Sequence, residues 1–343
     1  MYDVVIIGMG PGGSTLARLL DKNLKVAIID KKNDKITKCC GGLLSPDAQK
    51  SLANFDICLP KNVVVDPQIF SVKTLDFEQN IEKYYQRFYV NMNRAKFDIF
   101  LSSIIENNVE IFNDYICTGV IKNNEYFEVS ILKNKKKSIL KSKMVIGADG
   151  ADSIVRRKMF PNKKIKQYVA IQEWYREENK NSFYSCIFDS KITDSYAWTI
   201  SKDNHFIIGG AFPKNNCNER FEALKNQAKT FGMNFGVLEK REGCFVNIYT
   251  LGSLCLGKNN AYLIGEAAGM ISPSSLEGIS YAINSAKILA DIINKKKNIN
   301  KRYQIRTFSL RFKLWIKVIK KPFMYNKLLR KIVMKSNFGA LKK

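Results

Sequence analysis

The stretch YDVVIIGMGPGGSTLARLLDK, residues 2 to 22, joins a strand signal, a glycine-rich turn and a helix signal. Residues 2–7 are a β-branched run of the kind that makes a buried parallel strand, and an apolar spacing typical of a helix follows the turn. In the GxGxxG turn, Gly8 permits a tight bend, Gly10 lets the backbone approach a pyrophosphate, and Gly13 lets helix and strand pack closely. The order predicts a βα unit with an anion-binding helix N-terminus.

A second strand is predicted over residues 25–29, and it ends in Asp30. This acid lies 17 positions after Gly13 (13 to 30), where it suits a hydrogen bond to an adenosine ribose. Strand, helix, strand and terminal acid in this order predict a dinucleotide site, the alternative being a glycine-rich turn without a ligand. This part of the sequence does not separate NAD from FAD.

Three later stretches narrow the choice between NAD and FAD. VIGADGADSIVR (145–156) and AYLIGEAAG (261–269) each read as an apolar strand that runs into a glycine-containing turn. PSSLEGI (273–279) then opens a helix with the sequence SYAINSAKILADII. Together with the first turn, this ordered set resembles the flavoproteins of the para-hydroxybenzoate-hydroxylase type. Within them it resembles the geranylgeranyl-reductase family, including the CbrA-like proteins.

The resemblance covers most of residues 1–295 and implies both a fold and a cofactor. The implied fold class is α/β: a Rossmann-like FAD-binding domain, an antiparallel β-sheet substrate domain and a helical C-terminal tail. The boundaries expected are 1–155 with 256–295 for the FAD-binding domain and 156–255 for the substrate domain. Residues 60–90 are candidates to join the substrate sheet, and 296–343 form the basic tail.

The resemblance also implies roles for two acids. The DG motif of these flavoproteins lies near the pyrophosphate, which points to Asp149, and the carboxylate of their GD motif holds the ribityl chain, which points to Glu266. Glu266 stands where aspartate is usual, and it keeps the charge with one more methylene. Gly278 and Ile279 begin a helix, so their N–H groups can face the flavin N1–C2=O edge and stabilise a reduced flavin. An ordinary helix start is the alternative.

KCCGGLLSP, residues 38–46, follows the second strand after a short basic link, residues 31–37. Two glycines allow backbone contact with a planar ring or a phosphate, because no Cβ intervenes. In the resembled family a Cys-Gly segment at this place lines the flavin, so Cys40, Gly41 and Leu43 are expected flavin contacts. A buried structural cysteine and a redox switch are the alternatives. Cys40 is a weak candidate for chemistry, and no other catalytic residue is predicted.

Two further cofactor contacts rest on the resemblance. A helix from Arg94 to near Ile105 resembles the family's RxxFDxxL helix, whose arginine reaches the cofactor. A surface arginine at a helix start is the alternative, although the helix dipole disfavours it there. A strand is expected over 109–112, and Thr118, in a predicted turn with Cys117, falls where the family offers backbone groups to adenine.

The middle of the chain changes to a period of two, which is typical of antiparallel strands. The strands expected are 168–174, 183–188, 196–200 and 206–212, and they suit a roof over an isoalloxazine ring. Tyr196-Ala197-Trp198 resembles the YxW motif of geranylgeranyl reductases, which continues with Phe-Pro, whereas this chain has Ile200-Ser201. Trp174, Tyr196 and Trp198 are candidate substrate-lining residues, and sheet core is the alternative for all three.

Composition excludes several classes of protein. The formal net charge is +25, but lysine recurs in ordinary turns and no zinc-finger, RRM or KH signature accompanies it, so no nucleic-acid partner is expected. The chain has eight cysteines without a CxxC pair, and His205 is its one histidine, so no metal site or His-based triad is expected. The N-terminus lacks signal-peptide features, and no stretch approaches the roughly 18 apolar residues of a membrane span. A cytoplasmic protein is expected.

The C-terminal tail is strongly basic, because no acidic residue follows Asp291. Apolar and cationic residues alternate at helical spacing in RFKLWIKVIKKPFMYNKLLRKIVMKSNF, and a break is predicted at Pro322. The pattern fits a helix pair packed on the body or an amphipathic face on anionic lipid. Packing is favoured because Trp315, Phe323 and Tyr325 would otherwise be exposed. Peripheral contact with the inner membrane face is expected as a secondary property.

These observations predict an FAD-dependent oxidoreductase that reduces a C=C bond of a hydrophobic or isoprenoid-like small molecule. The alternatives are a flavin-dependent aromatic monooxygenase and a flavin-binding resistance or scaffold protein without turnover. The halogenase signature WxWxIP is missing. No second GxGxxG follows a strand, so the electron donor is expected to be transiently bound NAD(P)H or a protein such as ferredoxin.

Overall fold

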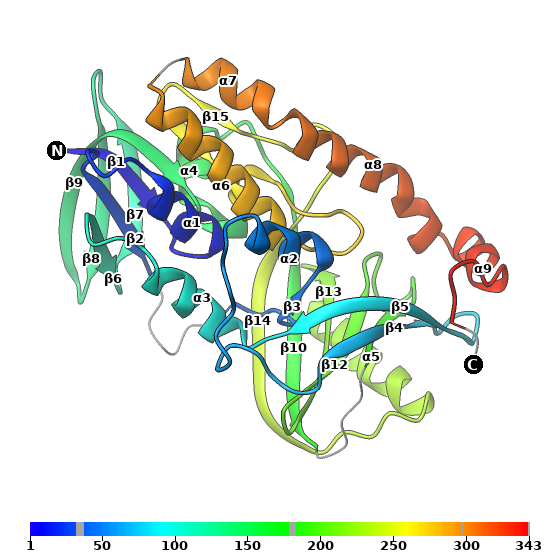
Figure 1. The fold of residues 1–343 in the computed structure, drawn as a ribbon. Helices are drawn as coiled ribbons and strands as arrows, with labels where there is room; N and C mark the ends of the chain where they lie inside the picture. The colour runs from blue at the N-terminus through cyan, green and yellow to red at the C-terminus, as the bar shows by residue number, and fades with distance from the viewer. Residues whose placement is uncertain (32–37, 178–182, 297, 342–343) are drawn as a thin grey trace. The chain divides into compact units, whose positions relative to one another are not determined.

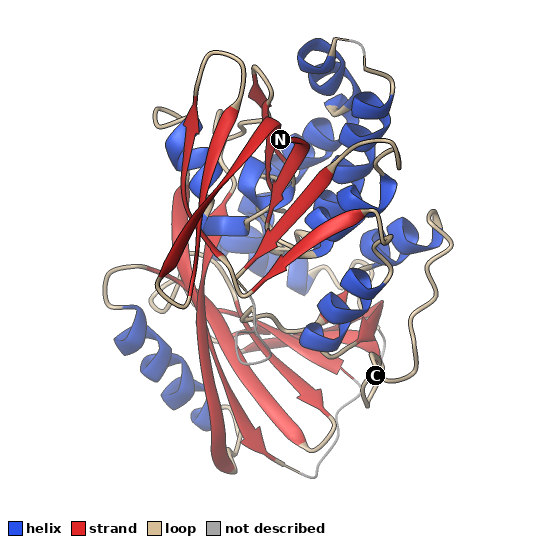
Figure 2. Cartoon of the chain, turned by 90° about the vertical axis from the view of Figure 1, so that its left-hand side faces the viewer, coloured by secondary structure: helices blue, strands red, loops and turns tan. Residues whose placement is uncertain are grey.

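Two eight-stranded sheets organise the chain, one in each of two structural units (Figures 1 and 2). The computed structural model describes residues 1–31, 38–177, 183–296 and 298–341. Unit 1 comprises Met1–Thr37, Ala95–Lys166 and Asn247–Ile316. Unit 2 comprises Lys38–Arg94, Gln167–Val246 and Lys317–Lys343. The division differs from the expected boundaries in that 38–94 join unit 2 and the tail is shared between the units.

The unit 1 sheet has the strand order β15-β16-β9-β1-β2-β6, in which β15 pairs antiparallel with β16 and the other four pairings are parallel. The β-branched runs predicted as the first two strands form β1 (Tyr2–Ile7) and β2 (Val26–Asp30), whose cores are almost fully buried. Strands covered on both faces read as continuous apolar runs, which is why these two were recognisable. The other strands are β6 (Val109–Asn113), β7 (Ile116–Lys122), β8 (Phe127–Lys133), β9 (Lys136–Gly147), β15 (Gly257–Lys258) and β16 (Ala261–Leu263).

Helices α1 (Pro11–Leu19) and α6 (Ile279–Asn294) pack against each other in unit 1. The contact is close at the start of α1, where a Cβ on Gly12 would lie 3.5 Å from the Cβ of Ala282. This packing places the N-terminal turns of both helices in one unit. The remaining helical elements that begin in or near this unit are α3 (Arg94–Ser103), η1 (Gly150–Asp152), α4 (Ile154–Met159), η2 (Gly265–Ala268) and α7 (Ile299–Arg306).

The unit 2 sheet has the strand order β14-β10-β13-β12-β11-β4-β5-β3. It is mixed and not wholly antiparallel as predicted, because β4 pairs parallel with β11. Helix α5 (Cys217–Thr230) packs Phe221, Leu224 and Ala228 on an apolar cluster of one sheet face. The strands are β3 (Leu43–Leu44), β4 (Ile69–Asp76), β5 (Ile81–Asn91), β10 (Lys166–Arg176), β11 (Phe183–Phe188), β12 (Ala197–Lys202), β13 (His205–Pro213) and β14 (Val237–Ile248).

The described part of the tail forms three helices, α7, α8 (Phe308–Tyr325) and α9 (Lys327–Lys335), which are orange to red in Figure 1. The predicted break at Pro322 is wrong, because α8 continues through it and ends at Tyr325. A proline so near the end of a helix removes one hydrogen bond, and the bend occurs instead at Asn326, whose side chain caps α9. Within the described residues, no helix is long and apolar enough to cross a bilayer.

Candidate functional site

The GxGxxG turn in unit 1 has the geometry that its glycines require. Gly8 has φ +99°, and a Cβ on Gly13 would lie 1.8 Å from the carbonyl oxygen of Gly8, so neither position accepts a side chain without rearrangement. A Cβ on Gly10, in contrast, would meet no atom within 4 Å. The turn is therefore tightly built around Gly8 and Gly13 and open beside Gly10, where a phosphate could approach the backbone.

Two more turns lie at the same edge of the unit 1 sheet. The amide of Ala148 donates to Ile7 O at 2.8 Å, and the amide of Ile264 donates to Gly147 O at 3.0 Å, so the GADG and GEAAG turns follow the ends of β9 and β16. Ligands of open α/β sheets bind at such carboxyl ends. Asp30 is at the same edge, as the buried last residue of β2.

Asp149 has one carboxylate oxygen that the protein leaves unpaired. Its Oδ2 accepts from the amide of Ile154 at 2.7 Å, whereas its buried Oδ1 has no hydrogen-bond partner among the described residues. Burial raises the pKa of this carboxyl above its ordinary value. An unpaired buried acceptor is costly, so this oxygen is a candidate to receive a donor from a ligand or from water.

Glu266 lies next to the DG turn and is already partly engaged. A Cβ on Gly150 would lie 3.9 Å from its Oε2. Its Oε1 accepts from the amide of Asn247 at 2.9 Å, and the Asn247 side chain donates to Glu266 O at 3.0 Å. The longer side chain of glutamate thus brings one oxygen to β14 and leaves Oε2 on the side of Gly150.

Arg156 holds the GEAAG turn in place by hydrogen bonds. This role was not predicted, although Arg156 ends the VIGADGADSIVR stretch. The guanidinium is 4% exposed and donates to Ala267 O at 3.1 Å and to Lys163 O at 2.8 Å. Its remaining nitrogen donates to Ser253 O. Because these three hydrogen bonds all go to backbone carbonyls, Arg156 positions the turn.

The N-terminal end of α6 has a carboxylate beside it, that of Glu277. Gly278 is the N-cap and Ile279 the first helical residue, as predicted. Glu277 accepts from the amide of Ser280 and from its hydroxyl, both at 2.8 Å. A fixed carboxylate at this end offsets part of the positive helix dipole, so the helix offers an anion less stabilisation than the sequence suggested.

In unit 2, the KCCGG loop lies against the sheet face opposite α5. A Cβ on Gly41 would lie 2.6 Å from Ile200 and 3.9 Å from the indole nitrogen of Trp198, so only glycine fits there. Gly42 has φ +65°, and its amide donates to the Cys40 sulfur at 3.4 Å. Leu43 starts β3, which pairs with the end of β5. The link residues 32–37 lie outside the described residues.

Lys202 anchors this loop by hydrogen bonds, a role that the sequence did not predict. Its side chain is 3% exposed, and Nζ donates to Gly42 O at 3.1 Å, to Met92 O at 2.7 Å and to Asn91 Oδ1. Burial lowers the pKa of Lys202 to about 7, although the nearby Cys40 and Asp203 act against the shift. A lysine at the end of an otherwise uncharged strand was the available signal.

Two polar atoms beside the loop also have no described partner. Gln172 donates from Nε2 to Cys40 O at 3.4 Å and to Glu242 at 2.8 Å, but its Oε1 is buried and unpaired, as is Nε1 of Trp198. The two side chains meet over Gly209, where a Cβ would lie 2.7 Å from the indole and 2.8 Å from Gln172 Cβ. A buried donor and a buried acceptor therefore lie on the loop-facing side of the sheet.

The three predicted substrate-lining residues all belong to unit 2. The rings of Tyr196 and Trp198 are 5.7 Å apart, and Tyr196 packs with Tyr184, Met324 and Tyr325 on a small apolar cluster. Trp174 donates to Glu242 at 2.9 Å. A cavity of about 390 Å³ opens near Lys73, Glu82 and Phe231. Its lining includes residues of the apolar cluster that α5 covers. None of the three aromatic residues lines it.

The structure places the remaining predicted contacts as follows. Arg94 is the half-buried first residue of α3, as expected from the sequence. The predicted turn at Cys117 and Thr118 is wrong, because both residues lie inside β7. A register shift between Cys117 and Gly119 interrupts the pairing with β8, so the local signal was a bulge and not a turn. Thr118 is exposed.

Comparison with known proteins supports this description of the fold. No family model matches the chain. Protein CbrA of Shigella dysenteriae serotype 1 is 44% identical over 346 residues, covering 99% of this chain and 98% of that protein, and Protein CbrA of Escherichia coli O157:H7 is 44% identical with the same coverage.

Among solved structures, a geranylgeranyl bacteriochlorophyll reductase-like protein of Thermoplasma acidophilum has a TM-score of 0.73 at 23% identity, covering 99% of this chain and 88% of its own. PqsL of Pseudomonas aeruginosa, a probable FAD-dependent monooxygenase, has a TM-score of 0.73 at 16% identity, covering 98% and 99%. The flavin-dependent brominase Bmp2 has 0.69 at 19%, covering 97% and 92%. These likenesses confirm the predicted fold class and concern the fold alone.

Proposed function

The chain belongs to the CbrA family, and from this premise we propose that it is an FAD-dependent oxidoreductase. One observation carries the proposal. In unit 1, three glycine-containing turns and the acids Asp30, Asp149 and Glu266 lie at the carboxyl ends of the parallel strands of one sheet, and Asp149 Oδ1 there has no described partner. The parts that a dinucleotide needs are thus assembled within a single unit.

The residues present fit FAD. The open space at Gly10 and the N-terminus of α1 suit the pyrophosphate, and Asp30 suits the adenosine ribose. Asp149 is the proposed neighbour of the pyrophosphate and Glu266 that of the ribityl chain, whose hydroxyl groups can donate to carboxylate oxygens such as the unpaired Oδ1 of Asp149. Arg94 and Thr118 remain proposed contacts, the latter from a strand.

The proposed substrate class is argued from residues of unit 2. When bound, FAD accepts a hydride from a donor and passes it to an acceptor. We assign Cys40, Gly41 and Leu43 to its ring, and the aromatic face with Trp174, Tyr196 and Trp198 to a hydrophobic substrate, as in reduction of an isoprenoid-like C=C bond. The buried donor and acceptor on Trp198 and Gln172 can orient a polar group of that substrate. NAD(P)H or ferredoxin is the proposed electron donor.

Anaerobic stopped-flow reduction followed by reoxidation tests the reaction class. The bound flavin is expected to bleach with NADPH, NADH or reduced ferredoxin and to reoxidise slowly when mixed with oxygen. Rapid reoxidation that an aromatic substrate accelerates would instead assign a monooxygenase, a class to which PqsL belongs by its description. Absence of reduction by all three donors would contradict an oxidoreductase and leave a flavin-binding scaffold.

A further inference from the structure

The exposed side of α8 carries a row of apolar side chains, which we call the apolar stripe: Phe308, Phe312, Trp315, Ile319 and Phe323. They recur every three or four residues, which places them on one side of a helix, and they are 45–62% exposed. Phe312 stacks on Phe308 with ring centroids 6.1 Å apart and on Trp315 at 5.7 Å. The expectation that Trp315 and Phe323 are covered by packing is therefore wrong.

The stripe is exposed because the other side of α8 is the one that packs. Leu310 and Leu314 are buried, at helix positions roughly opposite the stripe. Near the C-terminal end of α8, Tyr325 contacts the unit 2 cluster that contains Phe188, with ring centroids 5.6 Å apart. The helix is thus held by one side and presents the other to its surroundings.

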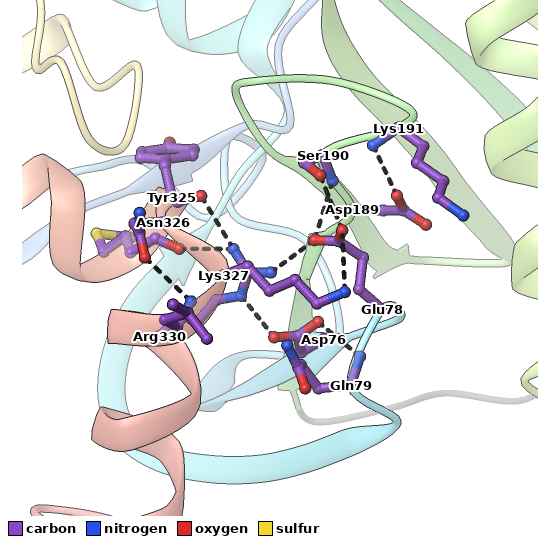
Figure 3. A network of polar contacts seen from close by, with 12 residues as sticks. Asp76, Glu78, Gln79, Asp189, Ser190, Lys191, Tyr325, Asn326, Lys327 and Arg330 are labelled. Carbon is purple, nitrogen blue, oxygen red and sulfur yellow. Dashed lines mark hydrogen bonds and ion pairs between the residues drawn. The ribbon is translucent and has the colours of Figure 1, made fainter.

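The next helix is fixed as firmly, as Figure 3 shows. Arg330 of α9 is 3% exposed, and it donates to Asp76 at 2.7 Å and to Glu78 at 3.1 Å. Its third nitrogen donates to Met324 O at 3.0 Å, at the end of α8. A buried guanidinium with this set of acceptors keeps the turn between the two helices in place.

The charged residues of α8 and α9 themselves are all basic, and Lys317 of α8 pairs with Asp47 at 3.5 Å. No acidic residue follows Asp291, and on α8 the exposed Lys313 and Lys320 lie about 100–120° from the centre of the stripe, both on the same flank. Long lysine side chains along this flank can extend to a charged surface while the stripe inserts beside them. The basic residues of the two helices are Arg311, Lys313, Lys317, Lys320, Lys321, Lys327, Arg330, Lys331 and Lys335.

We propose that α8 is a docking surface for an anionic lipid bilayer, lying in the plane of the interface. An exposed apolar row with lysines along its flank is the pattern of interfacial helices, and it accounts for the apolar and cationic residues together. A second copy of this chain would bring two helices of like charge together, and nucleic acid would leave the stripe unused. The proposal does not depend on FAD.

The test is co-sedimentation of the full chain with vesicles of phosphatidylcholine containing phosphatidylglycerol, and with vesicles of phosphatidylcholine alone. Binding to the anionic vesicles alone, weakened by salt, is expected. Phe312→Ser/Ile319→Ser should lower the affinity at least about tenfold, because binding scales with the apolar area inserted. Lys313→Gln/Lys320→Gln should lower it about 30-fold, the equivalent of about 1 kcal/mol per charge. Emission of Trp315 should shift to the blue.

The controls remove similar side chains from unit 1, far along the sequence from the tail. Ile121 and Ile139 are 58% and 59% exposed, and Lys136 and Lys137 are exposed cations of β9. Ile121→Ser/Ile139→Ser and Lys136→Gln/Lys137→Gln should each bind vesicles within twofold of the parent. Thermal unfolding of all four variants verifies that they fold.

Three results would overturn the proposal. One is full-length protein that ignores anionic vesicles at low salt. Another is an equal loss in tail and control variants, which would show general attraction of a basic protein. The third is a dimer in gel filtration that the stripe variant converts to monomer, which would assign the stripe to a second copy of the chain.

Discussion

Lys202 shows how much one buried side chain can organise. Its nitrogen contacts oxygens from Gly42, Met92 and Asn91, which join the KCCGG loop to the end of β5. Three acceptors match the three protons of an ammonium group, whereas burial favours the neutral amine. The balance between these effects falls near neutral pH, because the pKa of Lys202 is lowered to about 7.

This balance predicts a pH-dependent stability. The pKa of Lys202 is lower in the folded chain than its ordinary value of 10.5, so the unfolded chain binds more protons between about pH 7 and 10.5. The free energy of unfolding should therefore rise with pH across this window, by on the order of 3–5 kcal/mol for the full shift. Urea unfolding of the parent at pH 7 and pH 9.5 measures the rise.

Lys202→Met should lose this rise, and the exposed Lys214→Met, from the same unit, should keep it. The methionine variant is also expected to be less stable at every pH, because three carbonyl oxygens lose their donor. An identical slope with pH in the parent and in Lys202→Met would show that Lys202 does not titrate in this range.

At the scale of elements, two glycines of the first βα turn have different roles, Gly13 in folding and Gly10 in the proposed cofactor binding. A Cβ on Gly13 would lie 1.8 Å from a backbone oxygen, whereas a Cβ on Gly10 meets open space. Gly13→Ala should therefore cost several kcal/mol of stability, as overpacking against backbone does. Gly10→Ala should fold within about 1 kcal/mol of the parent and bind FAD at least about tenfold more weakly, because its methyl group occupies the phosphate position.

Chemical denaturation and flavin fluorescence titration of both variants provide the comparison. If Gly10→Ala bound FAD like the parent, the space beside Gly10 would not be the pyrophosphate site. If Gly13→Ala were as stable as the parent, the turn would have more freedom than the structure gives it.

The elements differed in how well their residues predicted them. Continuous β-branched runs and glycine spacing predicted β1, α1 and β2, because these signals are local. The parallel pairing of β4 with β11 could not be predicted, since it joins segments about 110 residues apart. The contacts of Lys202 and Arg156 with backbone carbonyls depend on tertiary structure for the same reason. The bulge at Cys117 resembled a turn because both interrupt a strand.

The link between α9 and β4 makes a separate prediction. Arg330→Met leaves Asp76, which is fully buried, without its cationic partner. Removing one member of a buried ion pair costs about 3–5 kcal/mol, so the variant should unfold at lower denaturant and its tail should be cut sooner by trypsin. Lys327→Met is the control, because that lysine is half exposed and lies 3.8 Å from Glu78. Equal protease resistance in both variants would contradict the anchoring role of Arg330.

At the scale of the whole molecule, each unit contributes its own chemistry. Unit 1 holds the three turns and acids proposed for the dinucleotide half of FAD. Unit 2 holds the KCCGG loop and an aromatic sheet face. The proposed oxidoreductase needs both, but the cofactor claim rests on unit 1, because the unpaired acceptor of Asp149 and the open turn at Gly10 lie there.

The most direct test of that claim is to identify and titrate the cofactor of the purified full-length chain. Heat-released cofactor should be FAD at one equivalent per chain, and apoprotein should regain it on titration. Asp30→Ala should bind FAD about 5- to 150-fold more weakly, the loss of a hydrogen bond to a charged acceptor at about 1–3 kcal/mol. A preparation that carries FMN alone, or apoprotein that does not bind FAD, would contradict the account.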